Sequence, residues 1–188
     1  MTPQAEPPDA VLAARAAGGD ERAFASLMGR HKAALYRLAR RYVGDADDAY
    51  DVVQQSFVAA WKALDRYDPA WRFSTWLRAI ALNKCRDHAR RAAVRRLLMF
   101  ERPASAMYQV ADARPDAQAL WIAQQELAAL DRAIAGLPRA LKEPLLLTAF
   151  EGLSQSDAGR ELGISAKAVE TRVYRARKAL RQALGRMK

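Results

Sequence analysis

Two glycines four residues apart, Gly159 and Gly163, constrain the fold of this chain more than any other feature. They lie in the stretch SQSDAGRELGISAKAVETRVYRARK, residues 154–178, and Val169 follows six positions after the second glycine. Gly159 lacks a Cβ and allows a close backbone approach, while Gly163 permits the left-handed conformation that ends many helices. The spacing predicts two short helices that pack across each other and are joined by a tight turn.

Start signals precede both of these helices. Ser154 and Ser165 stand where a hydroxyl can accept hydrogen bonds from free backbone N–H groups, and Asp157 adds a negative charge to the first turn of the first helix. The second helix is expected to bury one apolar stripe, formed by Val169, Val173, Ala176, Leu180 and Leu184.

The opposite face of the second helix is expected to hold a hydroxyl and several cations but no carboxylate. Residues 152–188 contain nine Lys or Arg against three Asp or Glu, a net charge of +6. Such cations are often only the solvated face of a helical hairpin, but the turn and the two caps favour a helix that enters the major groove of DNA. At about 100° per residue this face carries Lys167, Thr171, Tyr174, Arg175 and Lys178, with Arg172 on its flank; Tyr174 either contacts DNA or packs on a helix.

The composition agrees with a protein that binds nucleic acid. The chain has 188 residues, a net charge of +10 and a pI near 10.2, and 51% of it is hydrophobic, which is enough for two small domains with their own cores. No apolar run approaches the roughly 20 residues that span a bilayer, and no secretory signal opens the chain, so we expect a cytoplasmic protein without membrane insertion.

Residues that usually carry catalysis are sparse. The one cysteine, Cys85, excludes an internal disulfide and is expected to be a buried or bystander thiol rather than a redox-sensitive one. Because His31 and His88 have no ligands at metal-binding spacing, and phosphate-loop and nucleophile motifs are absent, we expect no metal, no cofactor and no enzymatic activity.

Helical periodicity covers nearly all of the chain before residue 92 and after residue 119, whereas the stretch between them, with Pro103 and Pro115, has no sustained period. We therefore predict an all-α fold of two small helical domains joined by a flexible linker, the second containing the helix-turn-helix. The predicted boundaries are a disordered tip at 1–9, a first domain at 10–95, the linker at 96–118 and the second domain at 119–188.

A helix expected at about residues 46–64 in the first domain has an unusual outer face. Its outward residues include an exposed valine among acids and amides, which indicates a protein partner: Asp51, Gln54, Gln55, Val58 and Lys62. The aspartates at 45, 47 and 48 crowd the start of this helix, where capping explains them better than a metal does.

Aromatic residues and cations alternate in WRFSTWLRAIALNKCRDHARR, which follows a turn at Asp68 and Pro69. Residues 78–102 hold eight Lys or Arg against two acids, a second net charge of +6. Rings beside a basic groove can hold unstacked bases. Some of these rings are needed in the core, Trp71 and Phe73 more than Trp76.

Three motifs in this order, AYDVVQQSFVAAW, FSTWLRAIALNKCRDHARR and LPRALKEPLLLTAFEGLSQSDAGRELGISAKAVETRVYRARKALR, resemble bacterial RNA polymerase sigma factors of the extracytoplasmic-function (ECF) group, in the sigma-70 family. The resemblance covers nearly the full length. It implies that core RNA polymerase and promoter DNA are partners, that an anti-sigma factor is the regulator, and that the chain performs no catalysis.

Together with the outward faces described above, the resemblance assigns residues to three surfaces. The polymerase-binding residues are Asp51, Gln54, Gln55 and Val58. The residues for the minus ten promoter element are Phe73, Trp76, Arg78, Asn83, Arg86 and Arg90. The residues for the minus thirty-five element are Ser165, Lys167, Thr171, Arg172, Arg175 and Lys178.

Several positions depart from the family pattern. Tyr50 and Gln55 stand where family members usually have acids, and Asp157 and Ala158 replace a glutamate and an isoleucine. Pro144, inside KEPLLLTAF, is expected to kink or restart a helix because it has no amide donor.

Two other functions remain open from the residues alone. A stand-alone transcriptional regulator, whose first domain dimerises or senses a ligand, explains the helix-turn-helix but not the aromatic and basic helix. A helical enzyme acting on nucleic acid lacks any acid or metal constellation.

Overall fold

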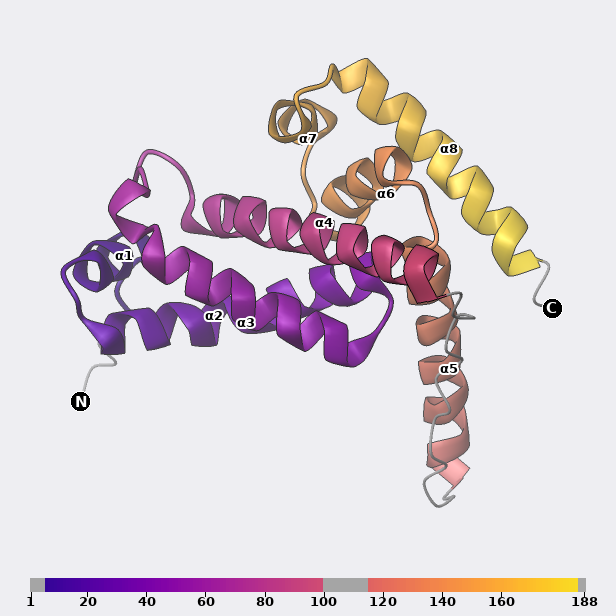
Figure 1. Ribbon diagram of the computed structural model, residues 1–188, viewed down its shortest axis with the longest axis horizontal. Helices are drawn as coiled ribbons and strands as arrows, with labels where there is room; N and C mark the ends of the chain where they lie inside the picture. The colour runs from indigo at the N-terminus through magenta and orange to yellow at the C-terminus, as the bar shows by residue number, and fades with distance from the viewer. Residues whose placement is uncertain (1–5, 100–114, 186–188) are drawn as a thin grey trace. The chain divides into compact units, whose positions relative to one another are not determined.

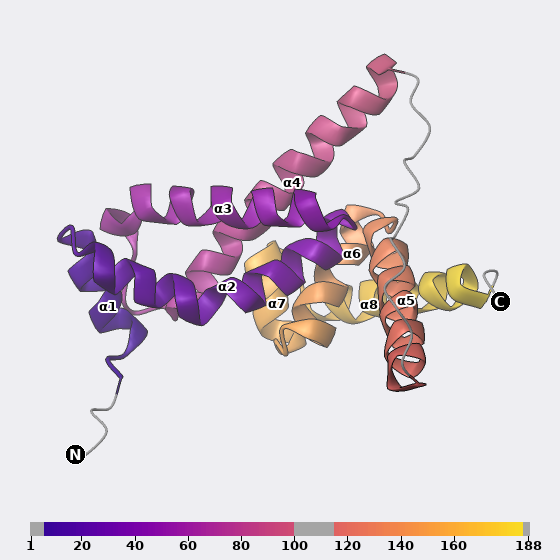
Figure 2. The same cartoon turned by 90° about the horizontal axis from the view of Figure 1, so that it is seen from below.

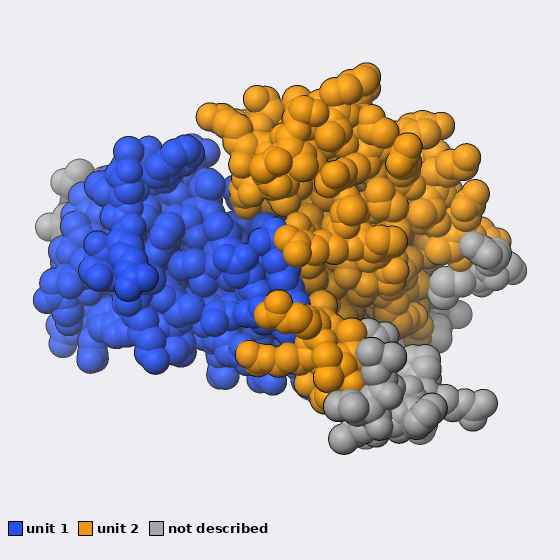
Figure 3. Space-filling model, turned by 45° about the horizontal axis from the view of Figure 1, so that its top comes forward, with its two compact units in different colours: residues 1–40, 46–87 blue, residues 41–45, 88–188 orange. Residues whose placement is uncertain are grey.

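The structure is a computed structural model that describes the backbone of residues 6–99 and 115–185 and the side chains of residues 6–95 and 124–185. All regular structure in these residues is helical, which confirms the predicted all-α class. The chain divides into two compact units, one of residues 1–40 and 46–87 and the other of residues 41–45 and 88–188 (Figure 3).

An antiparallel helix pair forms the body of the first unit. The helices α2 (Glu21–Val43) and α3 (Ala46–Lys62) run side by side (Figure 2). Ring contacts fix their register: the centroid of Phe24 lies 4.9 Å from that of Trp61, and the centroid of Tyr36 lies 4.6 Å from that of Tyr50. The short η1 (Leu64–Arg66) packs on both α1 (Asp9–Ala17) and α3, and a loop leads from it to α4 (Phe73–Met99).

The N-terminal segment is more ordered than expected. Residues 6–9 belong to the predicted disordered tip, but α1 begins at Asp9, and the guanidinium of Arg30 bonds to Pro7 and to Glu6. Proline at position 8 has a φ of −57°, which suits a helix start. Residues 1–5 lie outside the described residues.

Helices also enter the predicted linker from both ends. The helix α4 continues to Met99, and α5 (Pro115–Ala135) starts inside the range 96–118. Residues 100–114 lie outside the described residues.

The second unit is built around α8 (Ala166–Gly185), which packs on α5, α6 (Arg139–Leu145) and α7 (Gln155–Leu162) (Figure 1). Its core is apolar and includes Ile134, Leu145, Leu146, Leu147, Ala158, Val169, Ala176 and Leu180. Ala158 is fully buried, so the smaller residue at this departure from the family pattern still faces the core.

Pro144 lies inside α6 and does not end the helix. The helix α6 continues past the proline to Leu145, and the π-helix η2 (Leu146–Phe150) follows directly. The N–H of Glu151 then bonds to the carbonyl of Leu146, five residues back, at 3.1 Å. The helix therefore does not restart at the proline, and π-helical bonding begins two residues after it.

The turn between α7 and α8 has the predicted geometry. Gly163 ends α7 with a φ of +67°, and the hydroxyls of Ser154 and Ser165 accept the N–H groups of Asp157 at 3.0 Å and Ala168 at 3.1 Å. A Cβ on Gly159 would lie 2.6 Å from the carbonyl oxygen of Ile164, so the two backbones touch here.

We predict that Gly159→Ala destabilises the second unit by roughly 1–3 kcal/mol, because a methyl group must push this backbone carbonyl away. Urea unfolding followed by circular dichroism measures the change. Gly29→Ala is the matched control, since its Cβ has nothing within 4 Å and alanine favours a helix. Equal stabilities of Gly159→Ala and the parent would contradict the close approach.

Candidate nucleic-acid and partner interfaces

The helix α8 presents the predicted basic face to solvent. The side chains of Lys167, Thr171, Arg175 and Lys178 are exposed, and Arg172 is half-buried on the flank. Ser165 is exposed but also caps the helix, so its hydroxyl is already a hydrogen-bond acceptor. The structure thus brings all six predicted residues to one helix start and its outer surface.

A carboxylate borders this face, contrary to expectation. Glu170 Oε2 lies 2.8 Å from Lys167 Nζ, with the two side chains 50% and 81% exposed. Side chains three positions apart on a helix are neighbours, so Glu170 can reach Lys167 although it was not expected on this face. An exposed pair of this kind contributes little to stability, so Lys167 can exchange Glu170 for another anion at low cost.

Tyr174 also lies on the outer surface. Its side chain is 65% exposed, which excludes the alternative that it packs on a helix of its unit. The ring is therefore available to a partner.

The aromatic and basic segment at the start of α4 is divided between core and surface. Phe73 is 2% exposed and Arg78 is 8% exposed, so neither side chain can touch DNA in this conformation. Trp76 is half-buried. Asn83 is exposed and accepts a hydrogen bond of 2.8 Å from Arg86, and Arg90 is exposed further along the helix.

Trp71 lies outside, although we expected it in the core. It is 59% exposed at the end of the loop between η1 and α4. An Asp68 turn holds the loop: the N–H of Trp71 bonds to the carbonyl of Asp68 at 3.0 Å, and the hydroxyl of Tyr67 donates to the carbonyl of Trp71 at 2.7 Å. The sequence did contain a signal for this exposure. The dipeptide Asp68-Pro69 is typical of a surface turn, and Trp71 follows it by two positions.

An apolar hollow lies between α2 and α3 beside the predicted partner surface. The predicted residues Asp51, Gln54, Gln55 and Val58 are all exposed, and Val58 is 55% exposed. The hollow is lined mainly by apolar side chains, and Glu21, Lys32 and Gln54 add polar groups; the apolar ones are Phe24, Ala25, Met28, Val53, Phe57, Val58 and Trp61. Tyr50, one of the departures from the family pattern, is 51% exposed and stacks on Tyr36 near this surface.

Among the described residues, no group of three His, Cys, Asp or Glu side chains could hold a metal ion. Asp47 and Asp48 lie in the first turn of α3, and Cys85 is fully buried as predicted. None of the helices in the described part of the chain is long and apolar enough to cross a membrane.

Comparison with known proteins decides the family. Residues 27–95 match Sigma-70 region 2, and residues 127–180 match Sigma-70, region 4. The RNA polymerase sigma factor CnrH of Cupriavidus metallidurans is 42% identical over 178 residues, 93% of each chain. The ECF RNA polymerase sigma factor SigM of Mycobacterium tuberculosis is 35% identical over 94% of this chain and 85% of its own. This chain is an ECF RNA polymerase sigma factor.

The fold of the sigma factor agrees with this assignment. A solved structure of CnrH in complex with the cytosolic domain of CnrY matches it with a TM-score of 0.69 and 39% identity, over 96% of this chain and 99% of that one. As an ECF sigma factor, the chain binds core RNA polymerase and directs promoter-specific initiation of transcription.

Ionisation of Asp157 makes the stability of the start of α7 depend on pH. Its carboxylate accepts a hydrogen bond of 2.7 Å from the Ser154 hydroxyl and another from Arg160, and these bonds hold the pKa of Asp157 below its ordinary value of 3.8. A lowered pKa means that the folded protein prefers the ionised form. The resulting stability is present above about pH 4 and is lost as the pH falls through the lowered pKa.

We predict that Asp157→Asn lowers the stability of the sigma factor at pH 7 and that this difference shrinks below pH 4. Urea unfolding at a series of pH values measures it. Ser156→Ala, at the exposed neighbouring position, is the control and should leave the pH dependence unchanged. A difference that stays constant down to pH 2 would contradict the role of the ionised carboxylate.

Proposed function

We propose that this sigma factor holds promoter DNA with two separate surfaces, one along α4 and the loop before it and one on α8, and binds core polymerase through α3. The observation that carries the proposal is the outer face of α8, where an N-terminally capped helix of a helix-turn-helix presents lysine, threonine and arginine side chains. This is the geometry with which such helices enter the major groove.

The face of α8 is assigned to the minus thirty-five element. Arg175 and Arg172 have the planar fork that reads guanine O6 and N7, whereas Lys167 and Lys178 neutralise phosphates. Thr171 Oγ1 donates to the carbonyl of Lys167 at 2.9 Å, so its oxygen faces DNA as an acceptor and its methyl group as an apolar contact.

The surface around α4 is assigned to the minus ten element. Exposed Trp71 and half-buried Trp76 offer ring faces to unstacked bases, and Asn83, Arg86 and Arg90 follow with polar and cationic groups. A stacked base contributes about 1–3 kcal/mol without strict sequence demands, so strand opening is favoured by capture. Phe73 and Arg78 are both buried, so they support this surface from the core side and do not touch DNA.

The exposed side of α3 is assigned to core polymerase. Asp51, Gln54 and Gln55 lie on the two turns of α3 before Val58, and Gln54 and Val58 line the apolar hollow. A central apolar contact with a polar rim is the usual anatomy of a protein interface.

A regulatory partner completes the proposal. The similar CnrH was solved with the cytosolic domain of a second protein, CnrY. We propose that an anti-sigma factor binds this chain in the cytoplasm, and that the sigma factor itself carries no catalytic step. An inhibitor that covers polymerase- or DNA-binding residues would hold the chain inactive by competition.

Run-off transcription tests the proposed activity. We predict that purified core polymerase initiates at discrete sites on genomic fragments only after the sigma factor is added, because the core enzyme lacks the two promoter contacts. Core polymerase alone is the control. Failure to support specific initiation on any fragment would reject the function.

Base reading by Arg175 gives a sharper prediction. Arg175→Ala should weaken holoenzyme binding to a matched minus thirty-five element by about 1–3 kcal/mol and have little effect once that element is scrambled. Arg177→Ala is the matched control, because Arg177 is an exposed arginine on the other flank of α8. Equal losses for Arg175→Ala on both DNAs, measured by fluorescence anisotropy, would identify a phosphate contact instead.

A further inference from the structure

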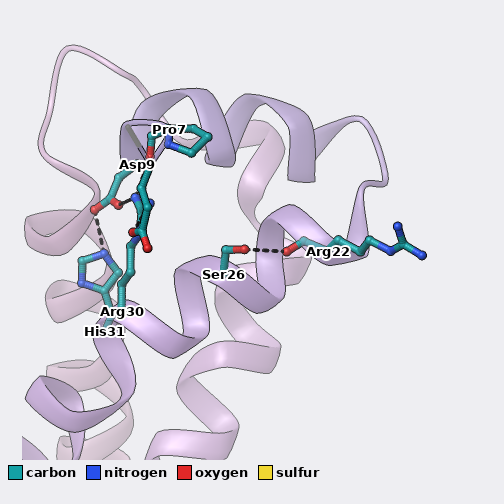
Figure 4. Close-up of polar contacts among 7 residues, drawn as sticks. Pro7, Asp9, Arg22, Ser26, Arg30 and His31 are labelled. Atoms are coloured by element: carbon teal, nitrogen blue, oxygen red, sulfur yellow. Dashed lines mark hydrogen bonds and ion pairs between the residues drawn. The ribbon is translucent and has the colours of Figure 1, made fainter. Parts of the chain in front are cut away.

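A compact cluster of charges joins the N-terminal segment to α2 at Asp9 (Figure 4). Asp9 Oδ1 accepts a hydrogen bond of 2.8 Å from Arg30, and Oδ2 lies 2.7 Å from His31 Nε2. Arg30 also donates to the carbonyl of Pro7 at 2.7 Å and to the Glu6 carboxylate at 2.9 Å. Only 15% of the His31 side chain is exposed, so its ring has a fixed environment.

The charge state of Asp9 fixes the orientation of the His31 ring. Partial burial raises the pKa of Asp9, but the hydrogen bonds from Arg30 and His31, with their charges, outweigh it and hold the pKa below 3.8. An ionised carboxylate can only accept, so we assign a proton to His31 Nε2. Since the bond points the ring in one direction, Asp9 determines which ring face meets the neighbouring helix.

The neighbour of that ring is the aromatic cluster under the loop of residues 67–72. The centroid of His31 lies 5.4 Å from that of Phe73, and the centroid of Phe73 lies 5.4 Å from that of Tyr67 in an edge-to-face contact. Burial, and then the charges of Asp9 and Asp68, raise the pKa of Tyr67, so its hydroxyl keeps the proton that it donates to Trp71. Contacts thus run from Asp9 through His31, Phe73 and Tyr67 to the exposed Trp71.

We propose that Asp9 is a positioning residue for promoter opening: its bond to His31 holds the aromatic cluster that sets the loop of residues 67–72 and the ring of Trp71. This inference rests on the proposed binding of the minus ten element by the first unit. It adds a residue of the N-terminal segment, far from any DNA-facing helix in the sequence, to the machinery of base capture.

Stability alone does not explain this cluster. The helix α1 has its own apolar anchor in Leu12, Ala13 and Ala16, and a second carboxylate, Asp20, already secures its other end through Arg15 at 2.7 Å. Partly buried charges gain little net stability because desolvation opposes their attraction. Their hydrogen bonds do impose one geometry, which is what a surface for flipped bases requires.

The first test uses the free sigma factor and needs no promoter. In Asp9→Asn, the amide of Trp71 should exchange with deuterium about tenfold faster than in the parent, because its bond to Asp68 opens more often. Asp20→Asn is the matched control, since it removes an ion-paired carboxylate near the other end of α1 without a contact to His31. Unchanged exchange at residues 67–72 in Asp9→Asn overturns the proposal, whatever the polymerase assays give.

The second test uses a promoter fragment identified by run-off transcription and prepared with an unpaired strand at the minus ten element. It measures how long reconstituted holoenzyme stays bound to this fragment, as a half-life. Asp9→Asn should shorten the half-life about threefold to tenfold, and Asp9→Glu should restore part of it. In a Trp71→Ala background, Asp9→Asn should have almost no further effect, because both changes act through one ring. Additive effects would overturn the proposal and mark Asp9 as a general stabiliser.

The two tests separate this inference from the proposed function. If the parent holoenzyme forms no complex on any such fragment, the promoter role of the first unit fails, while the exchange data still report on the contact from Asp9 to the loop. If the parent binds and Asp9→Asn binds equally long, the positioning role alone is rejected.

Discussion

Every helix that carries a proposed functional surface of this sigma factor also contributes to the core, and this constraint shapes the rest of the structure. A helix in a small all-α unit must bury one side, so only the remaining side is free to meet DNA or polymerase. On α8 the division is clean: Val169, Ala176 and Leu180 are buried and the cations lie opposite. At the start of α4 the core takes Phe73 and Arg78, and the exposed aromatic is supplied by the preceding loop.

The features that follow from local rules could be predicted from the sequence. Capping serines and the glycines of the turn act over three or four residues, so the helix-turn-helix could be predicted, although Glu170 at the border of its outer face was missed. The basic face of α8 follows from periodicity alone. Periodicity could not place Trp71, because it lies in a loop, although the Asp-Pro dipeptide before it is a local signal for a surface turn.

Contacts between residues far apart in the sequence could not be predicted from local rules. The bond between Asp9 and His31 joins residues 22 positions apart, and Asp9, the last residue of the expected disordered tip, is the first residue of α1. The ion pair of Lys167 and Glu170 is local but depends on side-chain rotamers. Two of the positions that depart from the family pattern keep local contacts. Asp157 accepts a hydrogen bond from Ser154, the cap of α7. Tyr50, in place of an acid, puts its ring against that of Tyr36.

The ion pair on α8 changes how DNA binding depends on salt. A lysine that binds a DNA phosphate displaces counterions condensed on the DNA. Each such contact makes the binding affinity fall more steeply as the salt concentration rises. Lys167 already carries a counterion of its own in Glu170. In the proposed DNA complex, a phosphate would replace that carboxylate as the partner of Lys167. The net electrostatic gain from this one lysine would then be slightly smaller than from a lysine with no carboxylate beside it.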